Sequence, residues 1–241
     1  MDPEYGARYR DLYERHWWWR SREAMVLDLL ERFAPAERDG DILDVGCGDG
    51  LLLAKLHRFG RPRGLEPEAA LLVTPPAERP APIDVCYLDA DYRPERPLAL
   101  VTMLDVLEHI ENDREALGHL HRILRPGGVA VLTVPALRWL WTRHDTLNHH
   151  HRRYHRGELT DRLRDAGFDV EICRYAYHWL VPLKLAIRLK EGLRAGAPTP
   201  PSVPAAPINT AFRCLSSAER RLPSRLRPPW GTSLVAVARR R

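Results

Sequence analysis

The chain has 241 residues, 44% of them hydrophobic, and a formal net charge of +5. This length and composition fit one α/β domain with a full core and exclude general disorder. The four cysteines form no Cys-x-x-Cys pair, which argues against a thiolate zinc site, and no apolar run reaches the ~20 residues of a membrane span.

The N-terminal part of the chain has a helical pattern. Residues 7–33 place apolar side chains among many charges, and Pro35 ends the pattern. Within it, Trp17, Trp18 and Trp19 cannot share one helical face, because neighbouring side chains point about 100° apart. At least one of these rings must therefore face something other than the domain core.

Strand and helix signals alternate along the rest of the chain. Such alternation predicts a parallel sheet with crossover helices on both faces. The predicted strands are 42–45, 63–65, 83–88, 98–104, 129–134, 168–175 and 232–238, and the predicted helices are 51–59, 113–124 and 158–166, with a turn at 125–128.

An insertion separates the last two predicted strands. It consists of an amphipathic segment at 179–193, a proline-rich linker at 197–207 and a helix at 209–221. The amphipathic segment places Lys184, Arg188 and Glu191 on one helical face and leaves a broad apolar surface. Two interpretations stay open: the segment roofs a substrate pocket, or it lies in a membrane interface.

The first predicted strand runs into a glycine-rich turn, Asp44-Val-Gly-Cys-Gly-Asp-Gly50. Gly46 and Gly48 allow a sharp bend and the close approach of a ligand, because neither carries a Cβ. A dinucleotide-binding loop uses the same physics, but its third glycine would fall at Leu51, so the spacing fails. Asp44 ends the strand, where its carboxylate could face a cationic ligand.

Acidic residues also follow the next three predicted strands. Glu66 lies 20 residues after Gly46, a position from which a carboxylate can accept hydrogen bonds from ribose hydroxyls. Asp89 follows the third strand and Asp105 follows the fourth. Because open α/β sheets bind ligands at the carboxyl ends of their strands, we expect these side chains to line one site.

Together these motifs resemble the class I S-adenosylmethionine-dependent methyltransferases. The resemblance rests on ILDVGCGDG, GLEP, LDAD, MLDVLEHI and LRPGGVAVLTVP, which occur in the family's order and cover roughly residues 40 to 175. It points to the broad group that includes the ubiquinone-biosynthesis O-methyltransferases. It implies S-adenosylmethionine as the cofactor and a doubly wound, Rossmann-like, seven-stranded and mostly parallel sheet, with an N-terminal helical lid and a helical insertion before the last strand.

The resemblance also implies which residues bind the cofactor. It places the methionine portion against Gly46, Cys47, Gly48, Leu104 and Asp105, the ribose against Glu66 and the adenine against Asp89 and Ala90, and we add Asp44 to the same site. The N-terminal segment becomes a lid from which Arg20 or Arg22 reaches the cofactor carboxylate, and we assign Arg22. The alternative for this segment is a packing belt against the sheet.

The region after the fifth strand is rich in polar side chains, and the resemblance places it over the transferred methyl group. Methyl transfer is an in-line displacement, so the enzyme contributes position and deprotonation of the acceptor. Histidine suits that proton transfer, and we hypothesise that His144 or His150 is the base, while Arg152 or Arg153 pairs with an anionic group on the acceptor. The residues predicted for catalysis are His144, His150 and Asp105, and those predicted for the substrate are Trp141, Arg152, Arg153 and Tyr154.

The same loop allows an alternative with a divalent metal. His144, Asp145 and one of the histidines at 149–151 could converge on such an ion. Because consecutive loop histidines more often face solvent or substrate, we assign no metal ligand. Glu108 and His109 open a helix, so we favour a capping or cofactor-wall role for them.

We expect three segments: a lid at 1–36, a core at 37–178 and 229–241, and the insertion at 179–228. The expected reaction is O-methylation of a small or lipid-like acceptor, with release of S-adenosylhomocysteine. An NAD(P)-dependent reductase on a similar sheet is the alternative, against which the missing third glycine counts. A binding module without catalysis is a third interpretation.

The charge pattern and the N-terminus bear on partners and location. We expect no nucleic-acid partner, because no basic stripe with interleaved aromatic residues is present. The acidic, aromatic N-terminus lacks the basic start and apolar run of a signal peptide. We therefore expect a cytoplasmic protein, with peripheral contact at the inner face of the membrane through residues 179–194 as the open alternative.

Overall fold

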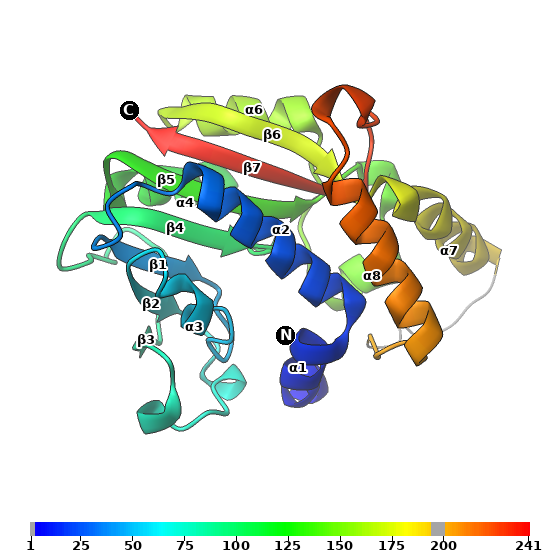
Figure 1. Ribbon diagram of the computed structural model, residues 1–241, viewed down its shortest axis with the longest axis horizontal. Helices are drawn as coiled ribbons and strands as arrows, with labels where there is room; N and C mark the ends of the chain where they lie inside the picture. Colours follow the sequence, from blue (N-terminus) through cyan, green and yellow to red (C-terminus); the bar gives the residue numbers. More distant parts are fainter. Residues whose placement is uncertain (1–2, 194–200) are drawn as a thin grey trace.

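A seven-stranded sheet forms the centre of the computed structural model, which describes residues 3–193 and 201–241 (Figure 1). The strands are β1 (Asp41–Val45), β2 (Arg61–Leu65), β3 (Ile83–Asp84), β4 (Leu98–Leu104), β5 (Leu124–Pro135), β6 (Phe168–Ala176) and β7 (Ser233–Arg240). Their order in the sheet is β3-β2-β1-β4-β5-β7-β6. β7 is antiparallel to β5 and β6, and the other neighbouring pairs are parallel, which confirms the predicted seven-stranded, mostly parallel sheet.

Side chains along the central strands alternate between the two faces of this sheet. In β1, Leu43 belongs to one hydrophobic core and Ile42 to the other. In β4, Val101 belongs to the same core as Leu43, and Leu100 belongs to the same core as Ile42. Both faces therefore need a covering of helices, as a sheet with parallel strands usually does.

Helices cover both faces, and this confirms the doubly wound arrangement. The helices are α1 (Pro3–Arg15), α2 (Trp17–Phe33), α3 (Leu53–Leu56), α4 (Asp113–Ile123), α5 (Arg143–Leu147), α6 (Arg156–Asp165), α7 (Val181–Leu193) and α8 (Ala206–Arg220). α4 and α6 pack on one face, and α1, α2 and α3 pack on the other, where α2 crosses the front of the sheet in Figure 1.

The N-terminal helical segment is two helices rather than the one predicted over 7–33. His16 separates them with extended backbone, φ −74° and ψ 132°, and its ring accepts a hydrogen bond from the Trp18 amide. Histidine is not among the usual N-capping residues, so this break has no strong signal in the sequence. Farther along α2, Val26 and Leu30 are fully buried, so this half of the helix is part of the core.

Three other predicted elements differ from the structure. A strand was predicted at 83–88, but β3 ends at Asp84. β3 is the edge strand of the sheet, and beyond it the side chains of Val85 and Tyr87 are exposed. The helix predicted at 51–59 is regular only over α3. The turn predicted at 125–128 lies inside β5, where Gly127 has φ 73° and the register with β4 shifts.

The insertion before β7 folds as predicted, as α7 followed by α8. α8 packs beside α2, and Asn209 joins them: its side-chain oxygen accepts from the Trp17 amide at 2.8 Å and its side-chain nitrogen donates to the Arg15 carbonyl at 2.8 Å. Residues 197–200 of the predicted linker lie outside the described residues. Within the described part of the chain, no helix combines the length and the apolarity needed to cross a bilayer. The predicted segment boundaries stay a prediction.

Candidate active site

A cavity of about 540 Å³ lies at the carboxyl ends of β1, β2, β4 and β5. The sheet order puts β1 and β2 on one side of β4 and puts β5 on the other. We call the part lined by residues that follow β1 and β2 the first half of the cavity, and the part lined by residues 142–153 and by α7 the second half. Most of the residues predicted for the site line it, namely Arg22, Asp44, Gly46, Cys47, Gly48, Glu66, Leu104, Asp105, His144, His150 and Arg153.

The glycine turn after β1 forms the floor of the first half. Gly46 and Gly48 have φ of 69° and 54°, in the left-handed region that favours glycine. A Cβ at Gly46 would lie 2.4 Å from a methyl of Val106, and a Cβ at Gly48 would lie 3.0 Å from the Tyr9 ring. Side chains at these positions would therefore disturb both the turn and its neighbours. Burial raises the pKa of the Cys47 thiol, so we assign this residue to the wall and not to chemistry.

Two buried carboxylates are fixed beside this turn. Glu66 is 5% exposed, and its oxygens accept hydrogen bonds from the Gly48 amide at 2.9 Å and the Glu68 amide at 3.0 Å. Asp44 accepts from the Thr102 hydroxyl at 2.6 Å, and burial raises its pKa to about 7. The backbone of the glycine turn and the acidic group at the end of β2 are thus held in one rigid arrangement.

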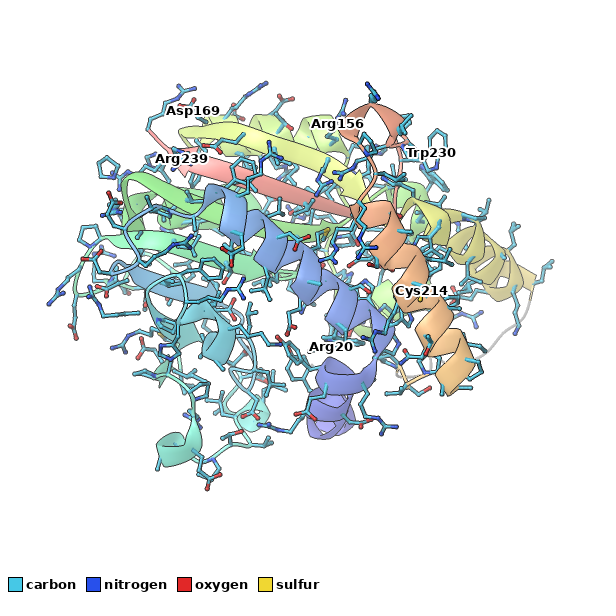
Figure 2. All side chains as sticks on the ribbon, in the orientation of Figure 1. Arg20, Arg156, Asp169, Cys214, Trp230 and Arg239 are labelled. Carbon is cyan, nitrogen blue, oxygen red and sulfur yellow. The ribbon has the colours of Figure 1, made fainter. Side chains whose placement is uncertain are left out.

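Asp105 joins the end of β4 to the N-terminal segment. It has φ 57°, an unusual value for a non-glycine residue, and accepts from the Thr133 hydroxyl at 2.9 Å. Arg22 forms an ion pair with Asp105 and donates to the Leu104 carbonyl at 3.3 Å. The proposed contact of Arg22 with a cofactor carboxylate stays a prediction. Arg20, labelled in Figure 2, pairs instead with Glu23 at 3.2 Å and does not line the cavity.

The predicted adenine contacts lie away from this cavity. Asp89 and Ala90 are exposed and do not line it. The Asp89 carboxylate accepts from the amides of Asp91 at 2.9 Å and Tyr92 at 3.1 Å, so it stabilises its own turn. The structure therefore does not bring the predicted adenine pair to the rest of the site.

Asp145 is the centre of the second half. Its side chain has no solvent exposure and accepts from Arg153 at 2.8 and 3.0 Å, from a His150 ring nitrogen at 3.0 Å and from the Thr142 amide at 2.9 Å. Burial alone would raise the pKa of Asp145, but the bonds from His150 and Arg153 hold it well below its usual range. Asp145 is therefore an ionised group that orients its neighbours.

The two predicted histidine bases differ in their surroundings. His150 bonds Asp145 through Nδ1, and its ring meets the His109 ring edge-on with centroids 4.7 Å apart. With a proton on Nδ1, its Nε2 is the basic atom. His144 has Asn148 at 3.1 Å from Nε2, and burial lowers its pKa to about 4. Of the two, only His150 has an orienting carboxylate.

Three of the four predicted substrate residues do not reach the cavity. Trp141 donates to the Thr146 hydroxyl at 3.2 Å, and the fully buried Tyr154 donates to Asp113 at 2.8 Å. Arg152 pairs with the same Asp113 at 3.0 Å. The structure therefore does not bring these three side chains to the cavity, and their role as substrate contacts stays a prediction.

The structure also adds residues that the motifs did not indicate. Tyr9, Trp18 and Phe212 line the cavity from α1, α2 and α8. Lys184 and Glu191 line it from α7, as expected if that helix roofs a pocket. The helical face that carries Lys184 was visible in the sequence, but nothing local showed what this face would cover.

Comparisons with known proteins agree with this fold. A family model described as a methyltransferase domain matches residues 18–171, more than half of the chain. The chain belongs to the class I S-adenosylmethionine-dependent methyltransferases. The reductase alternative gains no support from any of these comparisons.

Two curated relatives and one solved structure illustrate the family. A probable S-adenosylmethionine-dependent methyltransferase of Mycolicibacterium smegmatis is 31% identical over 69% of this chain and 65% of its own length. A ubiquinone biosynthesis O-methyltransferase of Bradyrhizobium is 28% identical over 41% of each chain. The matches thus span less than two thirds of these relatives. The methyltransferase solved with the Trm112 activator of Haloferax volcanii has a TM-score of 0.62 at 19% identity, covering 98% of this chain and 94% of its own.

The methyltransferase cavity also contains a group of side chains with metal-binding geometry. Ligand atoms of Glu108, His109 and His150 lie within 4.8 Å of one another. Glu108 is 1% exposed, and its Oε2 has no hydrogen-bond partner among the described residues. A carboxylate and two imidazoles suit a divalent ion such as Zn²⁺. This group differs from the metal alternative considered from the sequence, because Asp145 is already bound to Arg153.

Proposed function

We propose that this protein transfers the methyl group of S-adenosylmethionine to a hydroxyl oxygen of a small or lipid-like acceptor. The observation that carries the proposal is the His150–Asp145 pair beside the cavity, because a hydroxyl acceptor must lose a proton during methylation. Similarity to a ubiquinone biosynthesis O-methyltransferase gives independent support.

In this proposal the two halves of the cavity have separate tasks. When bound, S-adenosylmethionine supplies a methyl carbon on a positively charged sulfur and leaves as S-adenosylhomocysteine. The glycine turn and Glu66 bind and orient the nucleoside at the ends of β1 and β2. Nε2 of His150 takes the proton of the acceptor hydroxyl, and Asp145 holds the ring and stabilises its charged form. Arg153 keeps Asp145 ionised and in place.

Replacing His150 by Gln tests this mechanism. With radiolabelled S-adenosylmethionine and a panel of phenols, catechols and hydroxybenzoates, we expect kcat to fall by about 10² to 10⁴. The affinity for S-adenosylhomocysteine, measured by calorimetry, should stay within about twofold, because Asp145 retains Arg153. The matched control is His155→Gln, an exposed histidine outside the cavity. Unimpaired turnover in the double variant His144→Ala, His150→Ala would contradict a histidine base.

A second mode of acceptor activation follows from the Glu108, His109 and His150 group. A divalent ion held there would bind the acceptor oxygen and lower its pKa. Equilibrium dialysis against Zn²⁺ and Mg²⁺ tests this mode, with Glu108→Gln as the variant that removes the anionic ligand. One ion per chain in the wild type and none in the variant would favour metal assistance, and no bound ion in either would leave His150 as the base.

We also propose that α7 contacts a membrane surface, which would suit a lipid-like acceptor. Leu185, Leu189 and Leu193 recur every four residues on this helix and are 39%, 61% and 86% exposed. Co-sedimentation with vesicles containing anionic lipid tests the contact. Failure to sediment at low salt would reject it.

A further inference from the structure

The second half of the cavity contains three cationic side chains besides its histidines: Arg143, Arg153 and Lys184. Two of them are bound within the protein. Arg153 forms its paired hydrogen bonds with Asp145. Arg143 donates to Glu191, from its amide to the carboxylate at 3.0 Å and from its guanidinium to the carbonyl at 2.7 Å.

Lys184 differs from both arginines. Within residues 3–193 and 201–241, no hydrogen bond or ion pair is made by its ammonium group, although it is only partly exposed. The two acidic groups of this region, Asp145 and Glu191, are engaged with the arginines. A partly buried charge without a partner is costly, so the position favours a ligand that brings the opposite charge.

Apolar side chains surround the same face of α7. Leu183 and Ile187, four residues apart on α7, and Leu180, just before the helix, line the cavity together with Lys184. Trp18 and Phe212 line it from α2 and α8. A molecule bound beside Lys184 would therefore place an apolar body against these aliphatic chains, with one negatively charged group at the ammonium.

We propose that Lys184 binds an anionic group of an otherwise apolar acceptor. This inference rests on the proposed function, because it names the class of molecule that the second half of the cavity takes. It also changes the assignment made from the sequence. Arg152 pairs with Asp113 and Arg153 with Asp145, so the anionic group is left to a residue that no motif indicated.

Two fluorescent dyes of similar apolar structure test the proposal. One is the anion 1-anilinonaphthalene-8-sulfonate, and the other is its neutral counterpart N-phenyl-1-naphthylamine. Each is titrated into the full chain in the presence of saturating S-adenosylhomocysteine. We expect Lys184→Met to raise the Kd of the anionic dye about tenfold and to change that of the neutral dye less than twofold.

Lys190→Met is the matched control, because Lys190 lies on the same helix but is exposed and does not line the cavity. It should leave both dyes unchanged. Equal weakening of both dyes by Lys184→Met, or an unchanged Kd for the anionic dye, would overturn the proposal. Lys184→Arg keeps the charge and should retain most of the anionic affinity. Should Lys184→Met fail to fold, Lys184→Gln supplies the same comparison.

Calorimetry with S-adenosylhomocysteine separates this proposal from the proposed function. The wild type and Lys184→Met should bind this product with equal affinity, because Lys184 belongs to the other half of the cavity. No binding to the wild type would refute the methyltransferase proposal whatever the dyes do. Normal product binding with no charge preference among the dyes would refute only the role of Lys184.

Discussion

At Asp145, five hydrogen-bond donor atoms from three residues converge on a side chain with no solvent exposure. Arg153 supplies the only full positive charge among these donors and is itself 3% exposed. The pair is therefore buried and mutually dependent. Removing one partner would leave an uncompensated charge in the interior, which costs far more than losing an exposed ion pair.

We predict that Arg153→Met lowers the free energy of unfolding by about 3 to 5 kcal/mol. Urea denaturation followed by tryptophan fluorescence measures the change. The control is Arg138→Met, which breaks the exposed ion pair between Arg138 and Glu158 and should cost less than about 1 kcal/mol. Similar small losses in both variants would show that Asp145 is compensated in another way.

Lys184 supports a prediction about pH. Burial, and then Arg153, lowers its pKa to about 8, while Asp145 and Glu191 oppose that shift. His144 is the other titratable group facing it, and its pKa of about 4 keeps it neutral at higher pH. Lys184 is thus charged below about pH 8 and loses its charge above it. Affinity for the anionic dye should fall between pH 7 and 9.5, and Lys184→Met should show no such fall.

Single residues also show what the sequence could and could not predict. Gly46, Gly48 and Glu66 line the cavity, because their position depends on a local turn and on the end of a neighbouring strand, and their contacts with the cofactor stay a prediction. Asp89 shared that pattern, yet its carboxylate is used by the amides of its own turn. Lys184 could not be assigned, because its surroundings come from residues about 30 and 40 positions away along the chain.

Among the elements, α8 has the most informative contacts. Asn209 bonds the Trp17 amide and the Arg15 carbonyl on either side of the break between α1 and α2. α1 carries Tyr9 to the glycine turn, so α8 stabilises a wall of the cavity that lies almost 200 residues away in sequence. The sequence predicted α8 from its local pattern but could not predict this contact.

We predict that Asn209→Ala raises the Kd for S-adenosylhomocysteine about two- to fivefold, because α1 is then held less firmly over the glycine turn. Hydrogen exchange should become faster at the Trp17 amide. Thr210→Ala, at an exposed neighbouring position of α8, is the control and should change neither quantity. Unaltered exchange at Trp17 in Asn209→Ala would show that the break is stabilised without α8.

At the scale of the whole molecule, the cavity is enclosed by parts of the chain from both ends and from the sheet edge. A mostly parallel sheet with helices on both faces was predictable, because strand and helix signals alternate along the chain. The order of the strands and the antiparallel direction of β7 were not predicted. The break at His16 was not predicted, because it depends on capping by a residue that rarely caps helices. The shortness of β3 was not predicted either, because it depends on the position of this strand at the edge of the sheet.

A ligand that fills the nucleoside half should stabilise the fold as a unit. At a hundredfold excess over Kd, binding contributes about 2.7 kcal/mol, which corresponds to a rise in Tm of about 5 to 10 °C for a chain of this size. Differential scanning fluorimetry should show this rise with S-adenosylhomocysteine and no rise with NAD or NADP. A larger shift with either dinucleotide would contradict the assignment of the cavity.

The bonds of Asp145 have one more consequence, for how such enzymes diversify. Among the described residues, all hydrogen-bond donors to that carboxylate belong to Thr142, His150 and Arg153, so this stretch neutralises its own interior charge. The glycine turn after β1, which we propose binds the nucleoside, donates none of these hydrogen bonds to Asp145. If the proposed roles hold, substitutions within residues 142–153 would change the acceptor pocket and leave the cofactor-binding turn after β1 unaltered.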